Sequence, residues 1–220
     1  MKQKVAILID GDFYIRMYFR HFNETYKTVD PHVLAKSIQT HCFKHIHKED
    51  EELYRIFFYD CKPISKKTQN PLTNKPIDFS KSDIFKVRTD LHSALLNTPR
   101  LSLRLGYLDE ANAYWTIKPD ESKNLLSKKI EFDDLQEEDI KYFAKQKGVD
   151  MRIGIDISTL TLKKQVDKII LISGDSDFVP AAKLARREGI IFTLDPMRNP
   201  IREDLKEHID YLTTTLPPKK

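Results

Sequence analysis

The stretch IILISGDSDFVPAAKLARREG, from Ile169 to Gly189, contains a strand, an acidic turn and a helix in immediate succession. The apolar run that ends at Ile172 shows no polar alternation, which is typical of a strand covered on both faces of a parallel sheet. The helical pattern of Phe178 to Glu188 stops at Gly189, a frequent helix terminator. A strand followed directly by a helix is the repeating unit of doubly wound α/β folds.

Four further apolar or aromatic runs predict strands, and helical patterns lie between several of them. The predicted strands are Val5–Ile9, Leu53–Tyr59, Leu101–Tyr107, Lys168–Ile172 and Ile190–Leu194. The predicted helices are Pro31–His47, Asp83–Leu96, Phe178–Glu188 and one or two within Glu137–Leu162. We therefore predict a three-layer, doubly wound α/β fold with a mainly parallel sheet of about five or six strands, the arrangement that alternating strands and helices favour.

The chain is long enough to bury a sizeable core, and we expect residues 1–215 to form one domain. Two regions interrupt the pattern. Residues 61–81 contain three prolines and read as an inserted loop region. Residues 108–134 are also loop-rich, with a small hairpin expected around Tyr114–Ile117. We expect residues 216–220 to be a flexible tail.

Composition excludes several classes of protein. The apolar runs are too short to span a membrane, and no signal-peptide pattern opens the chain, so we expect a cytoplasmic protein without membrane partners. Two cysteines cannot form a disulfide framework or a cysteine zinc site. The net charge of +4 is compatible with a polyanionic partner.

Acidic residues follow three of the predicted strands. Asp10 and Asp12 come after the first strand, Asp60 after the second, and Asp175 and Asp177 after the fourth. In an open parallel sheet, functional groups gather beyond the carboxyl ends of the strands. Clustered carboxylates repel one another unless some are protonated or a cation lies among them, and Mg²⁺ prefers such oxygen ligands.

Structural roles compete with metal binding at several of these aspartates. An aspartate at a strand end is often a turn former or a helix N-cap, which leaves Asp60 and Asp177 open to either interpretation. Asp175 has no evident cap to serve. Asp156 could be a solvated helix residue or the partner of Arg152.

His41 and His45 stand four residues apart on a predicted helix, a spacing that metal sites use. No third ligand is evident from the sequence, so we expect surface histidines. Tyr14 and Tyr18, which follow the first strand, could stack on nucleobases, although core packing is the favoured interpretation.

The segments AILIDGDF (6–13), KGVDMRIGIDI (147–157) and IILISGDSDFVPAAKLARREG (169–189) together resemble the NYN domains of the LabA-like (DUF88) group. These domains are relatives of PIN-domain nucleases. The resemblance implies a metal-dependent ribonuclease with a PIN-like fold that binds Mg²⁺ or Mn²⁺. The implied catalytic metal ligands are Asp10, Asp150, Asp175 and Asp177, with Asp12 and Asp156 as weaker candidates.

The implied partner is RNA, either single-stranded or structured, and a homodimer is left open. Candidate substrate-binding residues are Lys66, Lys67, Arg88, Lys183 and Arg186. Many relatives carry an asparagine three residues after the first aspartate, where this chain has Phe13. Two alternatives therefore stand beside the nuclease. One is a catalytically weak RNA-binding or regulatory module of the same fold. The other is a phosphatase of the haloacid dehalogenase type, which the Asp10-Gly-Asp12 pattern imitates.

Overall fold

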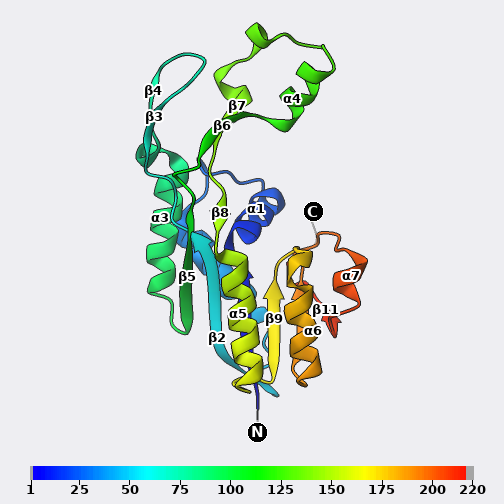
Figure 1. The fold of residues 1–220 in the computed structure, drawn as a ribbon. Coiled ribbons are helices and arrows are strands. Elements are labelled where there is room, and N and C mark those ends of the chain that lie inside the picture. The colour runs from blue at the N-terminus through cyan, green and yellow to red at the C-terminus, as the bar shows by residue number, and fades with distance from the viewer. Residues whose placement is uncertain (1, 217–220) are drawn as a thin grey trace.

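The computed structural model describes residues 2–216, and a seven-stranded sheet forms its centre. The strand order is β11-β10-β9-β1-β2-β5-β8, and every neighbouring pair is parallel except β5 with β8 (Figure 1). The strands are β1 (Gln3–Asp10), β2 (Glu51–Cys61), β5 (Leu101–Leu108), β8 (Gln146–Lys147), β9 (Lys168–Ile172), β10 (Ile191–Asp195) and β11 (Tyr211–Leu212). The central strand β1 pairs with β9 up to Ile9 and Ile172, so the carboxyl ends of these two strands are adjacent.

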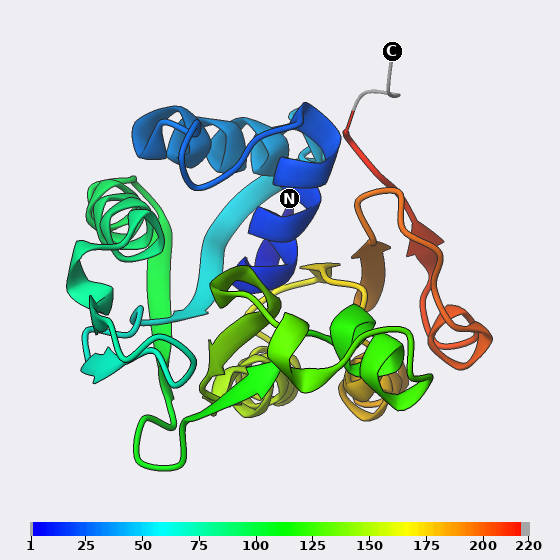
Figure 2. The same cartoon turned by 90° about the horizontal axis from the view of Figure 1, so that it is seen from above.

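Helices cover both faces of the sheet, as Figure 2 shows from above. One layer contains α1 (Gly11–Phe22), α2 (Pro31–Lys44) and α3 (Asp83–Leu96), and the other contains α5 (Val149–Leu162) and α6 (Val179–Arg187). Alternate residues of β1 serve the two layers. Ile7 and Ile9 pack toward the first helical layer, whereas Ala6 and Leu8 pack toward the second. The predicted three-layer α/β fold is therefore confirmed.

Local chemistry explains where the helices begin. The side chain of Asp30 accepts hydrogen bonds from the backbone N–H groups of His32 and Val33, and Pro31 occupies the first turn of α2. Ser82 caps α3 in the same manner through the N–H of Phe85. These side-chain oxygens satisfy backbone donors that have no partner within the first helical turn.

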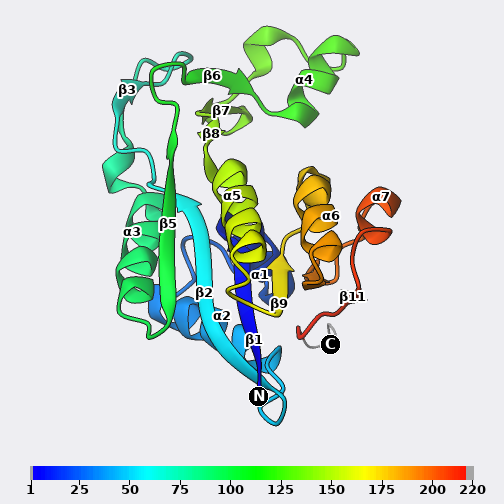
Figure 3. The ribbon, with the colours of Figure 1, turned by 60° about the horizontal axis from the view of Figure 1, so that its bottom comes forward.

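Two insertions rise beyond the carboxyl edge of the sheet (Figure 3). We call residues 62–81 and 109–145 the overhang. Its elements are the hairpin β3 (Lys67–Gln69) and β4 (Pro76–Asp78), the pair β6 (Tyr114–Ile117) and β7 (Ile140–Phe143), and helix α4 (Pro119–Leu126). Tyr142 joins the two insertions, because its ring stacks on that of Phe79 with 5.1 Å between the ring centres. Within its own insertion, Tyr142 contacts Trp115 in an edge-to-face arrangement with 5.4 Å between the ring centres.

The five predicted strands are all present, and α3 has the predicted bounds. The helix predicted within Glu137–Leu162 is α5, which begins at Val149, and residues 137–147 before it form a 3₁₀ turn and two short strands. Tyr114–Ile117 forms no local hairpin and pairs instead with β7, far along the chain. Helix α1 was not predicted.

Leu216, the first residue of the expected tail, is buried against the core, and residues 217–220 lie outside the described part of the chain. A short helix, α7 (Glu203–Lys206), precedes β11. Within residues 2–216, no helix has the length and apolar character needed to cross a membrane.

Candidate metal centre

Asp10 ends β1 at the middle of the sheet's carboxyl edge. Its Oδ1 accepts the backbone N–H of Phe13 at 3.1 Å and so caps α1. Burial raises the pKa of the Asp10 carboxyl to about 6, although the Phe13 hydrogen bond opposes this shift. The charges of Asp12 and Asp150 raise the pKa further. Asp10 is thus a carboxylate held in place by the backbone and surrounded by like charge.

Asp175 and Asp177 lie beyond the end of β9, next to the end of β1. Asp175 accepts the backbone N–H of Asp177 at 3.0 Å and caps the 3₁₀ turn Ser176–Phe178. The sequence left a cap at Asp177 open and indicated none at Asp175, whereas the structure places the cap at Asp175. A cap to a 3₁₀ turn of only three residues has no helical periodicity in the sequence to reveal it.

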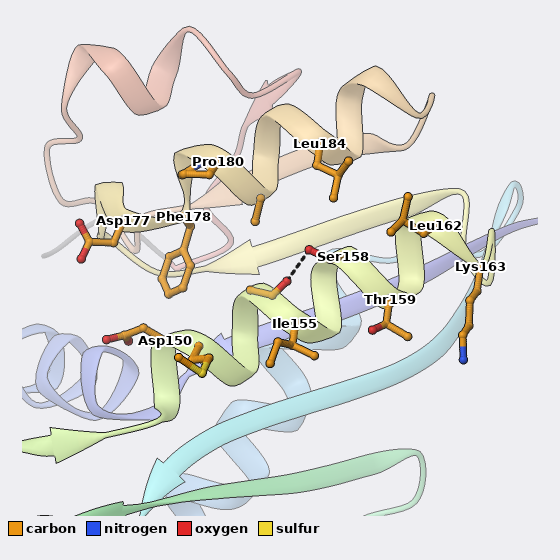
Figure 4. A pocket seen from close by; sticks show the side chains of 13 residues that line it. Asp150, Ile155, Ser158, Thr159, Leu162, Lys163, Asp177, Phe178, Pro180 and Leu184 are labelled. Atoms are coloured by element: carbon orange, nitrogen blue, oxygen red, sulfur yellow. Dashed lines mark hydrogen bonds between the residues drawn. The ribbon is translucent and has the colours of Figure 1, made fainter.

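Asp150 stands in the first turn of α5, two residues after Gly148, whose φ of 79° is favoured only for glycine. Burial raises the pKa of Asp150, and the charges of Asp175 and Asp177 add to the shift. Figure 4 shows Asp150 and Asp177 at the same end of the groove between α5 and α6. Farther along, apolar side chains such as Leu184 line much of this groove, so its carboxylates are confined to one end.

Ion pairing divides the aspartates at this edge into two groups. Within residues 2–216, the four carboxylates of Asp10, Asp150, Asp175 and Asp177 form no ion pair with a lysine, arginine or histidine. The other candidates are neutralised: Asp12 by Arg16 and Arg88, Asp60 by Arg88 and His92, and Asp156 by Arg104 with the hydroxyl of Tyr59. Asp10 and Asp150, whose carboxyl pKa values are raised, both belong to the unpaired group.

The four unpaired carboxylates are spread rather than closed around one point. No three of them bring their oxygens within 4.8 Å of one another, a criterion that the described residues meet elsewhere. Mg²⁺ commonly keeps several of its water ligands, and such waters can bridge the ion to carboxylates that do not reach it directly.

A cleft of about 360 Å³ separates Asp10 from Asp175. Its wall is formed by Phe13, which occupies the position where an asparagine was expected from the resemblance. A Cβ placed on Gly174 would lie 2.7 Å from the Phe13 ring, so only glycine permits this packing. The cleft therefore has carboxylates on two sides and a buried aromatic wall between them.

Comparison with known proteins assigns the chain to a family. The NYN domain profile matches residues 58–214, which is more than half of the chain. The chain belongs to the NYN domain family. Its members have a PIN-like nuclease fold. The match begins at residue 58 and so does not include Asp10 of β1.

A solved structure has a fold similar to that of this NYN domain. It is a protein of unknown function from Vibrio parahaemolyticus RIMD 2210633, with 17% sequence identity and a TM-score of 0.50. The similarity covers 97% of this chain and 93% of that one. A comparison with curated proteins gave no match.

The lysine and arginine side chains expected to contact phosphate differ in exposure and in whether an acidic residue already pairs with them. Lys66 and Lys183 are exposed, and the Lys66 ammonium lies 6.0 Å from the centre of the Tyr142 ring. Lys67 is also exposed and lies near Asp78, with 3.8 Å between the charged atoms. Arg186 is paired with Asp210 at 2.9 Å.

Arg88 is engaged inside the domain. Its Nη1 donates to Asp60 and its Nη2 to Asp12, each at 2.5 Å, and its Nε donates to the Tyr26 hydroxyl at 2.9 Å. All three nitrogens of the guanidinium are therefore occupied. Arg88 links the ends of β1 and β2 and neutralises their aspartates, and this leaves it unsuited to bind a phosphate.

The expectation of surface histidines in α2 was wrong. His41 and His45 are 5% and 4% exposed, and both contact Asp195 at the end of β10. Asp195 is a strand-end aspartate like Asp10 and Asp175, and that common position was the available signal. No local pattern indicates that the C-terminal end of α2 lies near the end of β10, and this placement brings the three together.

Proposed function

We propose that this NYN domain is a metal-dependent ribonuclease of the LabA-like group that hydrolyses RNA phosphodiester bonds. The observation that carries the proposal is the set of four unpaired carboxylates at the carboxyl edge of the sheet. They would hold Mg²⁺ or Mn²⁺, and the ligands are Asp10, Asp150, Asp175 and Asp177. Asp12 and Asp156 are left out because cationic side chains already neutralise them.

The donor set fits such an ion. Every donor is a carboxylate oxygen, and oxygen is the ligand that hard cations prefer. One oxygen of Asp10 and one of Asp175 accept backbone N–H groups, and these bonds orient each carboxylate and leave its second oxygen available. A bound divalent cation supplies an activated water and stabilises the negative charge that develops at phosphorus.

A groove of about 440 Å³ opens beside Asp12, between the sheet edge and the overhang. Aromatic rings line it: Tyr26, Phe79, Phe85, Tyr142 and Phe143. Stacking on aromatic rings binds single-stranded bases without requiring a particular sequence. We propose that a nucleobase next to the scissile phosphate occupies this groove.

The charge distribution supports a polyanionic substrate at the same place. Residues 61–81 and 140–147 contain eight lysines and one aspartate, although the whole chain has a net charge of only +4. The intervening residues 109–139 are acidic, with four lysines and ten carboxylates, so the positive charge is confined to the two segments that border the aromatic groove. We propose that residues 1–215 form one domain in which the lysine-bearing segments 61–81 and 140–147 hold the RNA.

One alternative retains a specific observation in its favour. Phe13 replaces a polar group with an apolar wall, which fits a module that binds RNA without cutting it. The phosphatase alternative has no such support, because Asp12, the second aspartate of the pattern that suggested it, is paired with Arg16 and Arg88.

The test compares cleavage of labelled single-stranded RNA in Mn²⁺, in Mg²⁺ and in chelator. We expect metal-dependent cleavage by the wild type and its loss in Asp175→Asn. Asp50→Asn is the matched control, because it removes an exposed carboxylate from the turn before β2, at the edge of the sheet opposite the four carboxylates, with the same change in charge. Intact RNA that still shifts on a gel would favour the binding module. Cleavage that persists in Asp175→Asn would contradict the site.

A further inference from the structure

Two histidines and one aspartate meet in the interior on the α2 side of the sheet, separate from the four carboxylates. His41 and His45 lie one helical turn apart, and their Nε2 atoms are 2.7 and 2.8 Å from the same oxygen, Oδ2 of Asp195. The Asp195 side chain is fully buried. Within the described chain, this is the one group of three such side chains whose ligand atoms all lie within 4.8 Å of one another.

Two of these side chains are also held from behind. His41 Nδ1 lies 3.3 Å from the hydroxyl of Tyr14, and Asp195 Oδ1 accepts the backbone N–H of Met197 at 2.7 Å. The atoms left to face one another are the two Nε2 atoms and Oδ2. Metal-binding histidines characteristically have their second ring nitrogen fixed by such an outer partner.

We propose that His41, His45 and Asp195 form a structural site for a borderline transition metal, with Zn²⁺ as the best-suited ion. Two imidazoles and one carboxylate suit Zn²⁺ far better than the hard cations expected at the four aspartates. With metal–ligand bonds of about 2.0–2.2 Å, tetrahedral ligands stand roughly 3.3 Å apart. The present separations need to open by about half an ångström, within reach of three side chains that rotate about their own bonds.

A fourth ligand and an entry path are also available. His45 and Thr193 line a pocket of about 440 Å³ at the edge of this cluster. Thr193 is two residues before Asp195 on β10, so its side chain faces the same side of the sheet. Its Oγ1 is buried and has no hydrogen-bond partner among the described residues. A water that completes the coordination of the ion would give this hydroxyl a partner.

The competing explanation is a clamp of hydrogen bonds, in which both Nε2–H groups donate to Oδ2. Such a clamp would also join α2 to β10. A metal explains the cluster better, because a single histidine would suffice to hold the carboxylate, whereas the second polar ring adds a desolvation cost.

The site has a structural consequence for the candidate metal centre at the carboxyl edge. Asp195 begins the loop in which Met197 and Arg198 have positive φ values of 48° and 66°. Two consecutive non-glycine residues in this conformation need firm support. The loop leads to Asn199, which lines the cleft between Asp10 and Asp175. The proposed zinc site would therefore hold one wall of that cleft.

The first experiment measures metal content by mass spectrometry in protein purified without an affinity tag or chelator and supplied with one equivalent of Zn²⁺. We expect one tightly held zinc per chain, lost in His45→Gln. His32→Gln is the matched control, because His32 is exposed in the first turn of the same helix. Zinc should also raise the unfolding temperature of the wild type and leave that of His45→Gln unchanged.

Two further measurements keep the outcome decisive. Co²⁺ bound to the wild type should give the visible absorption of a tetrahedral site, a readout that does not depend on whether a variant folds. Asp175→Asn should retain the zinc while losing RNA cleavage, which separates this site from the proposed nuclease function. A folded wild type that neither retains Zn²⁺ nor shows the Co²⁺ spectrum would overturn the proposal and leave a hydrogen-bonded clamp.

Discussion

The substitution Asp10→Asn tests the electrostatics of the carboxylate cluster most directly. The pKa of Asp10 rises from 3.8 to about 6 on folding, chiefly through burial. A raised pKa means that the folded protein binds this proton more tightly than the unfolded chain. The stability that protonated Asp10 contributes is therefore fully present below about pH 4 and is lost as the pH rises through about 6.

The shift sets the size of the expected effect. About 2 pKa units correspond to roughly 3 kcal/mol, since each unit is worth about 1.4 kcal/mol. Asp10 is partly exposed, and screening by solvent reduces this to roughly 1.5–3 kcal/mol of unfolding free energy. Asparagine is equally suited to an N-cap, so the substitution preserves the bond to Phe13 N while removing the charge.

The assay is urea unfolding in chelator at a series of pH values. We expect Asp10→Asn to be more stable than the wild type at pH 7, by the amount given above, and the difference to vanish near pH 4. Asp30→Asn is the control, because Asp30 caps α2 from an exposed position. Mg²⁺ should stabilise the wild type above pH 6 and have little effect on Asp10→Asn. A stability difference that does not change with pH would refute the reasoning.

Three further outcomes follow from the packing around the site. Gly174→Ala should destabilise the protein by roughly 1–3 kcal/mol, because the new Cβ would lie 2.7 Å from the buried Phe13 ring. Urea unfolding midpoints measure this loss, and the additional substitution Phe13→Leu should reduce it. Asp60→Asn should cost about 3 kcal/mol, because it removes the fully buried partner of Arg88 and leaves only the partly exposed Asp12 to offset the charge. Asp12→Asn should cost clearly less, and equal losses in thermal unfolding would contradict this ranking. Single-stranded RNA added to Asp175→Asn in chelator should change the fluorescence emission of Trp115, the single tryptophan. The further substitution Tyr142→Ala should abolish this change. No response at saturating RNA would exclude the aromatic groove as the base site.

Much of the fold could be read from the sequence because the information is local. Continuous apolar runs predicted the five main strands, and the helical pattern of Asp83–Leu96 predicted α3 with its bounds. No strand was predicted in residues 137–147, because the short strands there pair with partners elsewhere in the chain. Pairing of that kind depends on the approach of distant segments, which no periodicity within the segment records.

The sequence by itself determined the α/β fold class and the presence of carboxylates at the carboxyl ends of its strands, because strand burial and strand-end position are properties of short segments. Only the tertiary structure decided which carboxylates remain free. Arg88 comes from α3, reaches across two strand ends and neutralises Asp12 and Asp60, while Asp10 and Asp150 are left among like charges. The same holds for Asp195, which follows His41 and His45 by about 150 residues and meets them only because the end of α2 lies near the end of β10. Whether a carboxylate is neutralised and whether three ligands converge depend on distances between side chains that are far apart in the sequence, and only folding sets those distances.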